Sequence, residues 1–144
     1  FYVFAIGSRF SYNPSPMKFT VALAQISPVL GDVAANLEHH LVAIDEARAG
    51  GAALVVFPEL SLTGYALGDR AFDVAIRPTA DDPTFARLLA ASAEIDIVVS
   101  FVEVDDRHRH YISAAYLAGG GLVHLHRKLY LPTYGLFNES RVYT

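Results

Sequence analysis

The distribution of apolar and polar residues along the chain predicts strands that alternate with helices. Residues 19–26 (FTVALAQI) are rich in β-branched and apolar side chains, which predicts a strand that the breakers at 28–31 bring to an end. Residues 33–49 follow with apolar side chains at helical spacing, namely Leu37, Leu41, Ile44 and Ala47. Either Asp32 or Asn36 can cap the start of this helix, and the glycine pair at 50–51 stops it.

The second half of the chain continues this pattern and then changes to strands alone. Residues 53–57 predict a second strand, and the Asp-Asp-Pro segment at 81–83 predicts the first turn of a second helix. Residues 95–104 contain few polar side chains, which predicts a strand covered on both faces. Two further strands, at 111–117 and 122–126, form a predicted hairpin around a run of three glycines. This order predicts an α/β fold in which helices pack against a largely buried sheet.

The first sixteen residues differ from the rest of the chain. They show no sustained period and end in the breaker cluster Asn-Pro-Ser-Pro at 13–16. Met17, the single methionine, follows directly and precedes the first strand pattern. We therefore expect an N-terminal extension at 1–16, from upstream translation or a tag, and a domain at 17–144. A genuine N-terminal arm is the alternative interpretation of the extension.

Composition and charge argue against several classes of protein. At 144 residues, 53% hydrophobic and 18% charged, the chain has the composition of one globular domain. A net charge of −4, with basic residues clustered only at 107–110 and 126–128, argues against a nucleic-acid partner. No apolar run approaches the roughly 18 residues that a membrane span needs. The absence of cysteine excludes disulfides and thiolate metal sites, and it fits a reducing, cytoplasmic location.

A carboxylate stands at the end of the second predicted strand, where α/β folds place chemistry. The segment 55–65 (VVFPELSLTGY) contains an apolar run, a proline that ends it and then Glu59. Because its immediate neighbours are largely apolar, we expect Glu59 to be poorly solvated and to act as a general base. A solvated loop glutamate is the alternative interpretation of this segment.

Three strings of residues occur in an order that resembles one known family. They are FPELSLTGY at 57–65, HRK at 126–128 and LPTYGLFNE at 131–139. With the opening VALAQI at 21–26, they resemble the N-terminal half of the nitrilase superfamily of carbon–nitrogen hydrolases, from about Met17 onwards. The resemblance implies an α/β fold that forms the first half of an α-β-β-α sandwich. It also implies an enzyme that hydrolyses a non-peptide amide, carbamoyl or nitrile bond. FPELSLTGY is especially similar to the glutaminase branch that feeds ammonia to NAD synthetases, while small-amide and carbamoyl hydrolases remain equally open.

The resemblance also assigns roles to individual side chains. Glu59 matches the general base of a Glu-Lys-Cys triad, Lys128 matches the cation that stabilises the tetrahedral intermediate, and Glu139 matches a second, orienting carboxylate. Tyr65 and Tyr134 flank these strings and are candidates for contacting substrate, although aromatic packing at the loops explains them equally well. The expected partner is a small-molecule amide or nitrile, with no cofactor and no metal, and the full-length form is expected to be a homo-oligomer.

The chain departs from the family in one respect, because it contains no cysteine. In the family the nucleophilic cysteine lies beyond the lysine loop, and Ser100 and Ser113, inside predicted strands, do not replace it. We therefore expect the chain to stop before the nucleophile and not to turn over amides alone. Half of a sandwich exposes apolar strand faces, so we also expect poor solubility or self-association. The alternative function is a non-catalytic fragment or assembly module that retains half the fold.

The histidines give little support for a metal site. His124 and His126 lie two apart on a predicted strand and share a face, but two nitrogens without a third ligand make a weak case for zinc. His39 and His40 are expected on different faces of the first helix and in solvent. No metal-binding residues are therefore predicted.

Overall fold

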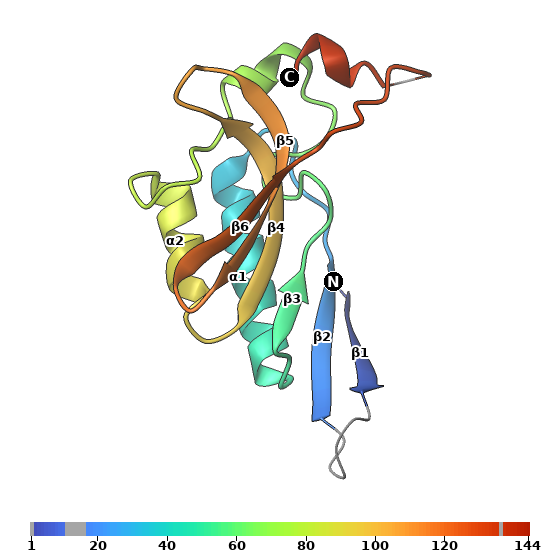
Figure 1. Cartoon of the computed structure of the whole chain (residues 1–144), viewed down its shortest axis with the longest axis vertical. Coiled ribbons are helices and arrows are strands. Elements are labelled where there is room, and N and C mark those ends of the chain that lie inside the picture. Colours follow the sequence, from blue (N-terminus) through green and yellow to red (C-terminus); the bar gives the residue numbers. More distant parts are fainter. Residues whose placement is uncertain (1, 11–16, 136) are drawn as a thin grey trace.

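A six-stranded mixed sheet forms the centre of the computed structural model, which describes residues 2–10, 17–135 and 137–144 (Figure 1). The strands lie side by side in sequence order: β1 (Tyr2–Phe10), β2 (Met17–Gln25), β3 (Leu54–Val56), β4 (Asp96–Val104), β5 (His110–Ala118) and β6 (Gly121–Arg127). β2, β3 and β4 are parallel, while the β1–β2, β4–β5 and β5–β6 pairs are antiparallel. The α/β order predicted from the sequence is confirmed.

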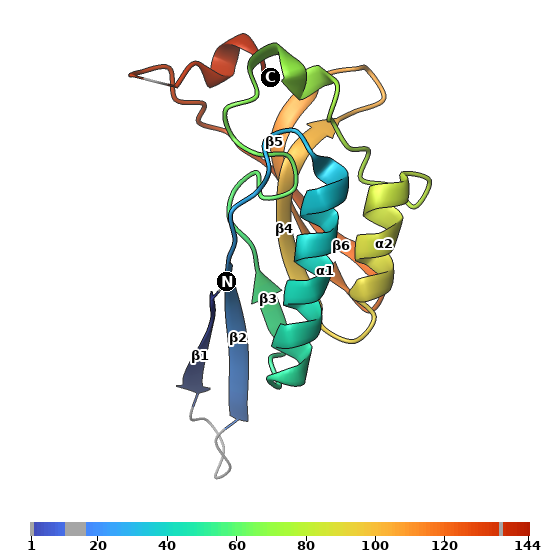
Figure 2. The same cartoon turned by 180° about the vertical axis from the view of Figure 1, so that it is seen from behind.

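Two α-helices, α1 (Val33–Ala49) and α2 (Pro83–Ala91), connect the parallel strands. Crossovers between adjacent parallel strands share one hand, so a sheet whose strands follow chain order receives both helices on the same face. Figure 2 shows both helices in front of the sheet, whereas in Figure 1 they lie behind it. Two short 3-10 helices, Gly68–Phe72 and Glu139–Arg141, lie in the loops at the end of the sheet that carries the C-terminus.

Local sequence signals explain where both α-helices begin. A side-chain oxygen of Asp32 accepts a hydrogen bond from the amide of Ala35 at 3.0 Å, so Asp32, and not Asn36, is the cap of α1. Asp82 caps α2 by accepting from the amides of Thr84 and Phe85 at 2.9 and 3.0 Å, and Pro83 occupies the first helical turn. The predicted start positions of the two helices are therefore correct.

The hydrophobic core lies between the helices and the sheet. Its fully buried side chains come from alternate positions of the strands and from the inner faces of the helices: Val55, Ile97, Val99, Phe101, Ala115, Leu117, Ala43, Phe85 and Leu88. The opposite face of the sheet carries no α-helix in the part of the chain that the structure describes (Figure 1); at one end, Ala71 of the first 3-10 helix packs there with Val102 and Ile112. On this open face Phe19 and Leu23 of β2 are 43% and 38% exposed. The expectation that β4 is covered on both faces is right only in part, because Val98 remains half-buried.

The sequence pattern missed one strand. β1 lies within the segment that showed no sustained period, and its backbone pairs with β2 in an antiparallel register from Tyr2↔Gln25 to Phe10↔Met17. The division of the chain into an extension at 1–16 and a domain at 17–144 stays a prediction. The glycine turn of the β5–β6 hairpin is confirmed, because Gly119 and Gly120 have φ angles of 58° and 77°, as the hairpin-forming type I′ turn requires. Among the described helices, none has the length and apolar character needed to cross a membrane.

Candidate active site

The loop that follows β3 is held against β4 by its backbone. The amide of Phe57 donates to the carbonyl of Val98 at 2.9 Å, and Pro58 then ends the strand because it has no amide hydrogen. The amide of Leu60 donates to Oγ of Ser100 at 3.0 Å. Leu60 has a φ of 52°, a left-handed conformation that is unfavourable for a leucine and that its complete burial and this hydrogen bond maintain. Ser100 thus fixes the turn that presents Glu59.

A glycine is required where the same loop passes the start of α1. Gly64 has a φ of 84°, and a Cβ at this position would lie 2.9 Å from a methyl group of Leu30 and 3.1 Å from its Cα. The carbonyl of the preceding Thr63 accepts from the amide of Gly31 at 2.9 Å. The Thr-Gly pair of the FPELSLTGY string therefore allows the loop after β3 to pack closely, backbone to backbone, against the loop before α1.

Two buried polar residues of α1 hold the loop from behind. Nδ2 of Asn36 donates to the carbonyl oxygens of Val29 and Leu62 at 2.8 and 2.9 Å. One turn further on, Nδ1 of His40 donates to the carbonyl of Asn36 at 2.6 Å, which leaves Nε2 to accept from Oγ of Ser61 at 2.9 Å. Both side chains are fully buried, so the expectation that His40 lies in solvent is wrong. Burial lowers the pKa of His40 to about 4, which keeps its ring neutral.

Lys128 joins the ends of three chain segments at the edge of the open face. Its Nζ lies 2.9 Å from Oε1 of Glu59, in the loop after β3, and 3.0 Å from Oε2 of Glu139, at the start of the second 3-10 helix. The backbone amide of Lys128 donates to the carbonyl of Ile112 at 2.8 Å, which extends the β5–β6 ladder to this residue. The side chains of Glu59, Lys128 and Glu139 are 45%, 25% and 6% exposed. The structure therefore brings together all three predicted catalytic residues.

The phenol of Tyr65 completes this cluster by donating a hydrogen bond to Oε1 of Glu139. Desolvation and the adjacent carboxylate of Glu139 raise the pKa of Tyr65, so the phenol stays protonated and keeps its donor. Glu139 also accepts from Nζ of Lys128 through the same oxygen at 3.1 Å. The buried carboxylate of Glu139 is thus compensated by one cation and one neutral donor.

The charge of Lys128 depends on its two carboxylate neighbours. Partial burial on its own acts to lower the pKa of Lys128, but the hydrogen bonds and charges of Glu59 and Glu139 outweigh that effect and raise the pKa. The ammonium group therefore stays charged at neutral pH. A fixed positive charge at this position can stabilise an oxyanion that develops beside it.

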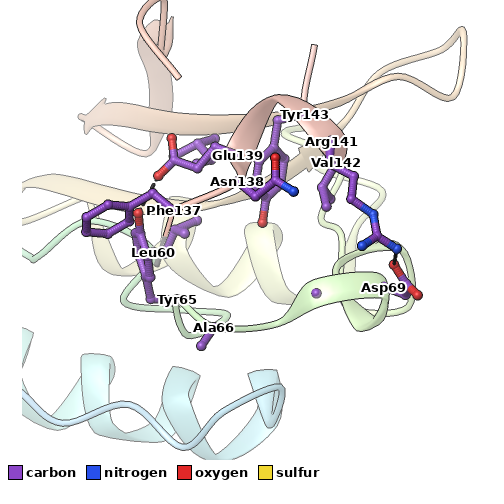
Figure 3. Close-up of a pocket in the computed structure, with 12 residues that line it drawn as sticks. Leu60, Tyr65, Ala66, Asp69, Phe137, Asn138, Glu139, Arg141, Val142 and Tyr143 are labelled. Atoms are coloured by element: carbon purple, nitrogen blue, oxygen red, sulfur yellow. Dashed lines mark hydrogen bonds and ion pairs between the residues drawn. The ribbon is translucent and has the colours of Figure 1, made fainter. Parts of the chain in front are cut away.

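Two hollows adjoin the cluster. One, of about 550 Å³, lies on the open face and is lined by Phe57, Glu59, Val98, Ser100, Ile112, Ala114, His126, Lys128, Leu129 and Tyr130. The other, of about 340 Å³, has Tyr65, Phe137 and Glu139 at one end and the ion pair of Arg141 with Asp69 at the other (Figure 3). Glu59 and Lys128 thus face the first hollow, while Glu139 lines the second.

The site differs from the sequence expectations in two respects. Glu59 is 45% exposed, so the expectation of poor solvation is wrong: the residue lies beyond the strand end, beside the open hollow. Tyr134 lies outside the cluster; it is 72% exposed and packs edge-to-face against Phe137, with ring centroids 5.7 Å apart. Its contact with substrate stays a prediction.

The sequence pattern did not predict that Asn36, His40 and Ser100 support the site. The only available signal was the presence of polar residues at positions that the apolar pattern places inward. His124 and His126 stack on β6 with ring centroids 6.4 Å apart. Among the described residues, no group of three or more potential ligands gathers into a metal site.

The fold and the cluster together define a class of protein: an α/β protein in which two carboxylates and an ammonium group meet beyond the ends of sheet strands. A family model described as carbon-nitrogen hydrolase matches residues 20–144. The chain belongs to the carbon-nitrogen hydrolase family.

Several curated proteins that are similar to this chain carry the same name, glutamine-dependent NAD(+) synthetase. The glutamine-dependent NAD(+) synthetase of Acinetobacter baylyi is 33% identical over 129 residues, which cover 88% of this chain and 23% of that protein. The synthetase of the same name from Mycobacterium bovis is 34% identical over 124 residues, or 84% of this chain and 18% of the relative. The chain therefore spans less than a quarter of these curated relatives.

Solved structures support the same fold. The glutamine-dependent NAD+ synthetase of Acinetobacter baumannii superposes with a TM-score of 0.74 at 32% identity, over 88% of this chain and 24% of that one. Nit3 of Saccharomyces cerevisiae, a member of the nitrilase superfamily, gives a TM-score of 0.74 at 24% identity, over 88% of this chain and 48% of its own. The second likeness establishes the nitrilase fold alone.

Proposed function

We propose that this chain supplies the general base, the cation and the orienting carboxylate of a carbon–nitrogen hydrolase that cleaves a small non-peptide amide. The observation that carries the proposal is the ammonium of Lys128 held between Glu59 at 2.9 Å and Glu139 at 3.0 Å, beside an open hollow. The side-chain amide of glutamine is the first candidate substrate, because the similar synthetases are named as glutamine-dependent.

The proposed chemistry uses a thiol nucleophile, which this chain does not contain. Glu59 takes the proton of the thiol, and the sulfur attacks the amide carbon to form a tetrahedral oxyanion. Lys128 stabilises that negative charge. The carbon–nitrogen bond then breaks, and ammonia leaves with the proton returned by Glu59. Water attacks the resulting thioester while Glu59 accepts its proton, and release of the acid restores the thiol.

Glu139 acts in this scheme through Lys128. Its carboxylate accepts from Lys128 and from Tyr65, so it limits where the ammonium can lie without contacting the substrate itself. A positioned base contributes typically ~10²–10⁴ in rate, and loss of one oxyanion-stabilising donor costs roughly 10²–10³. Both carboxylates and the cation are therefore needed, and the chain holds all three.

The test is to read the gene beyond Thr144 and to express whatever protein the whole reading frame encodes. A cysteine on a short apolar strand, followed by glutamine hydrolysis that Glu59→Gln lowers by at least ~10²-fold, would support the proposal. Glu46→Gln, on the exposed side of α1, is the matched control and should retain full activity. A stop codon directly after Thr144 would instead favour a non-catalytic assembly module.

The chain without a thiol gives a second test. We expect residues 1–144 alone to release no ammonia from glutamine above the rate in buffer, because the covalent route has no nucleophile. Turnover by this chain that Glu59→Gln abolishes would contradict the thiol mechanism and would point to direct attack by water.

A further inference from the structure

Two consecutive residues at the end of β6 point to opposite faces of the sheet. Side chains alternate along a strand, so Arg127 and Lys128 cannot both face the open hollow. Arg127 pairs with Glu103 of β4, on the same side of that strand as Phe101 in the helix-side core. Lys128 lines the hollow on the open face and meets Glu59 there. The orientation of either side chain therefore determines that of the other.

The partner of Arg127 is a fully buried carboxylate with a complete set of donors. Glu103 is 1% exposed, and Nε of Arg127 donates to its two oxygens at 3.1 and 3.0 Å while Oγ of Ser113 donates to one of them at 2.5 Å. The guanidinium carbon lies 3.9 Å from the ring centroid of Tyr111. A buried carboxylate without its cation is strongly unfavourable, and the forked geometry of arginine allows essentially one arrangement here.

The end of β6 needs such an anchor because it is an edge strand. Within the described residues it pairs with β5 alone, and that pairing shifts register between Tyr116 and Leu117. After Lys128 the chain leaves the sheet, and Leu129 is 77% exposed. A slip of one residue would turn Lys128 towards the helix face and Arg127 towards Glu59.

We propose that Arg127 is a positioning residue for Lys128: its ion pair with buried Glu103 locks the register at the end of β6, so that Lys128 must meet Glu59 and Glu139 on the opposite face. A role for Lys128 in amide hydrolysis rests on the proposed function, whereas its placement by Arg127 does not. The inference is therefore tested by locating Lys128 and not by measuring turnover.

The chain contains only two lysines, Lys18 and Lys128, which allows a direct measurement. A chain labelled with ¹³C-lysine should give two side-chain Cε signals, and each can be titrated with pH by nuclear magnetic resonance. The carboxylates of Glu59 and Glu139 raise the pKa of Lys128 in the parent chain. Lys18, at the start of β2, serves as the internal control.

In the Arg127→Gln variant, the direction in which the Lys128 titration midpoint moves distinguishes a positioning role of Arg127 from a direct electrostatic effect of its charge. Removing a nearby positive charge would by itself raise the Lys128 titration midpoint, whereas loss of contact with the two carboxylates lowers it. We expect the midpoint to fall and that of Lys18 to stay unchanged. The double variant Glu103→Gln/Arg127→Gln removes one charge of each sign and leaves no buried unpaired carboxylate, so it remains informative if the single variant does not fold. It should also lower the Lys128 midpoint.

Val99→Ala is the matched control, because it loosens the buried core of β4 without touching β6 or the ion pair. It should lower the unfolding temperature and leave the Lys128 titration as in the parent. An unchanged or raised Lys128 midpoint in the double variant, or an equal fall in Val99→Ala, would overturn the positioning role. Neither result depends on whether the protein hydrolyses amides.

Discussion

The phenol of Tyr65 donates a hydrogen bond to Glu139, which lies 74 residues further along the chain. This contact joins the loop after β3 to the C-terminal 3-10 helix, and Lys128 bridges the same two segments through its ion pairs. The candidate site is therefore also a tertiary crosslink. Changes in its polar residues should alter stability as well as chemistry.

Tyr65→Phe should lower the free energy of unfolding by about 1–2 kcal/mol, because a buried carboxylate loses one of its donors. Chemical denaturation followed by circular dichroism measures this change. Tyr130→Phe is the matched control, since Tyr130 is 89% exposed and should tolerate loss of its hydroxyl without measurable effect. Equal stability of the two variants would show that the Tyr65 hydrogen bond does not support Glu139.

Lys128→Met should destabilise the chain by about 2 kcal/mol, because it leaves the buried carboxylate of Glu139 without its cation. Lys18→Met, at an exposed position of β2, should change stability by less than ~0.5 kcal/mol. Folding raises the pKa of Lys128 above 10.5, its value in the unfolded chain. The contribution of Lys128 to the free energy of unfolding should therefore be fully present below pH 10.5 and disappear as the pH rises through the pKa of the folded chain. A constant difference between parent and variant across that alkaline range would contradict this assignment.

His40 should make stability depend on pH in the acid range. Its pKa is about 4 in the folded chain and 6.5 when unfolded, so between these values the unfolded state binds a proton that the folded state does not. Stability should therefore fall by roughly 3 kcal/mol as the pH drops from 6.5 to 4. His40→Gln should remove this part of the slope. His39→Gln, the exposed neighbour, should retain it, and an identical slope in both variants would rule out His40 as the source.

The open face of the sheet should make the chain self-associate, and a homo-oligomer of the full-length form stays a prediction. Phe19 and Leu23 project from β2 on the face opposite the buried Ala22 and Ala24, so lysine at both exposed positions should reduce association. Sedimentation velocity of the parent and of Phe19→Lys/Leu23→Lys measures it. Val42→Lys, on the outer side of α1 and 56% exposed, is the control for added charge. A monodisperse parent monomer would contradict the expectation.

Local patterns decided most of the fold. The period of apolar residues located α1, the Asp-Pro signal located the start of α2, and the glycine run located the β5–β6 turn. Each of these signals acts within a few residues, through backbone propensity or capping. β1 was missed because its sequence carries no periodic signal of its own. Its strand conformation comes from backbone pairing with β2.

The sequence also placed Glu59, Lys128 and Glu139 in strings that resemble one family, but it did not determine what surrounds them. Solvation of Glu59, burial of His40 and the ion pair of Arg127 with Glu103 all depend on segments that meet only in the folded chain. Burial and charge pairing arise from such long-range packing, and no window of sequence contains both partners. The sequence therefore identified the residues of the site, whereas the tertiary structure decided their exposure, their partners and the buried residues that hold them in place.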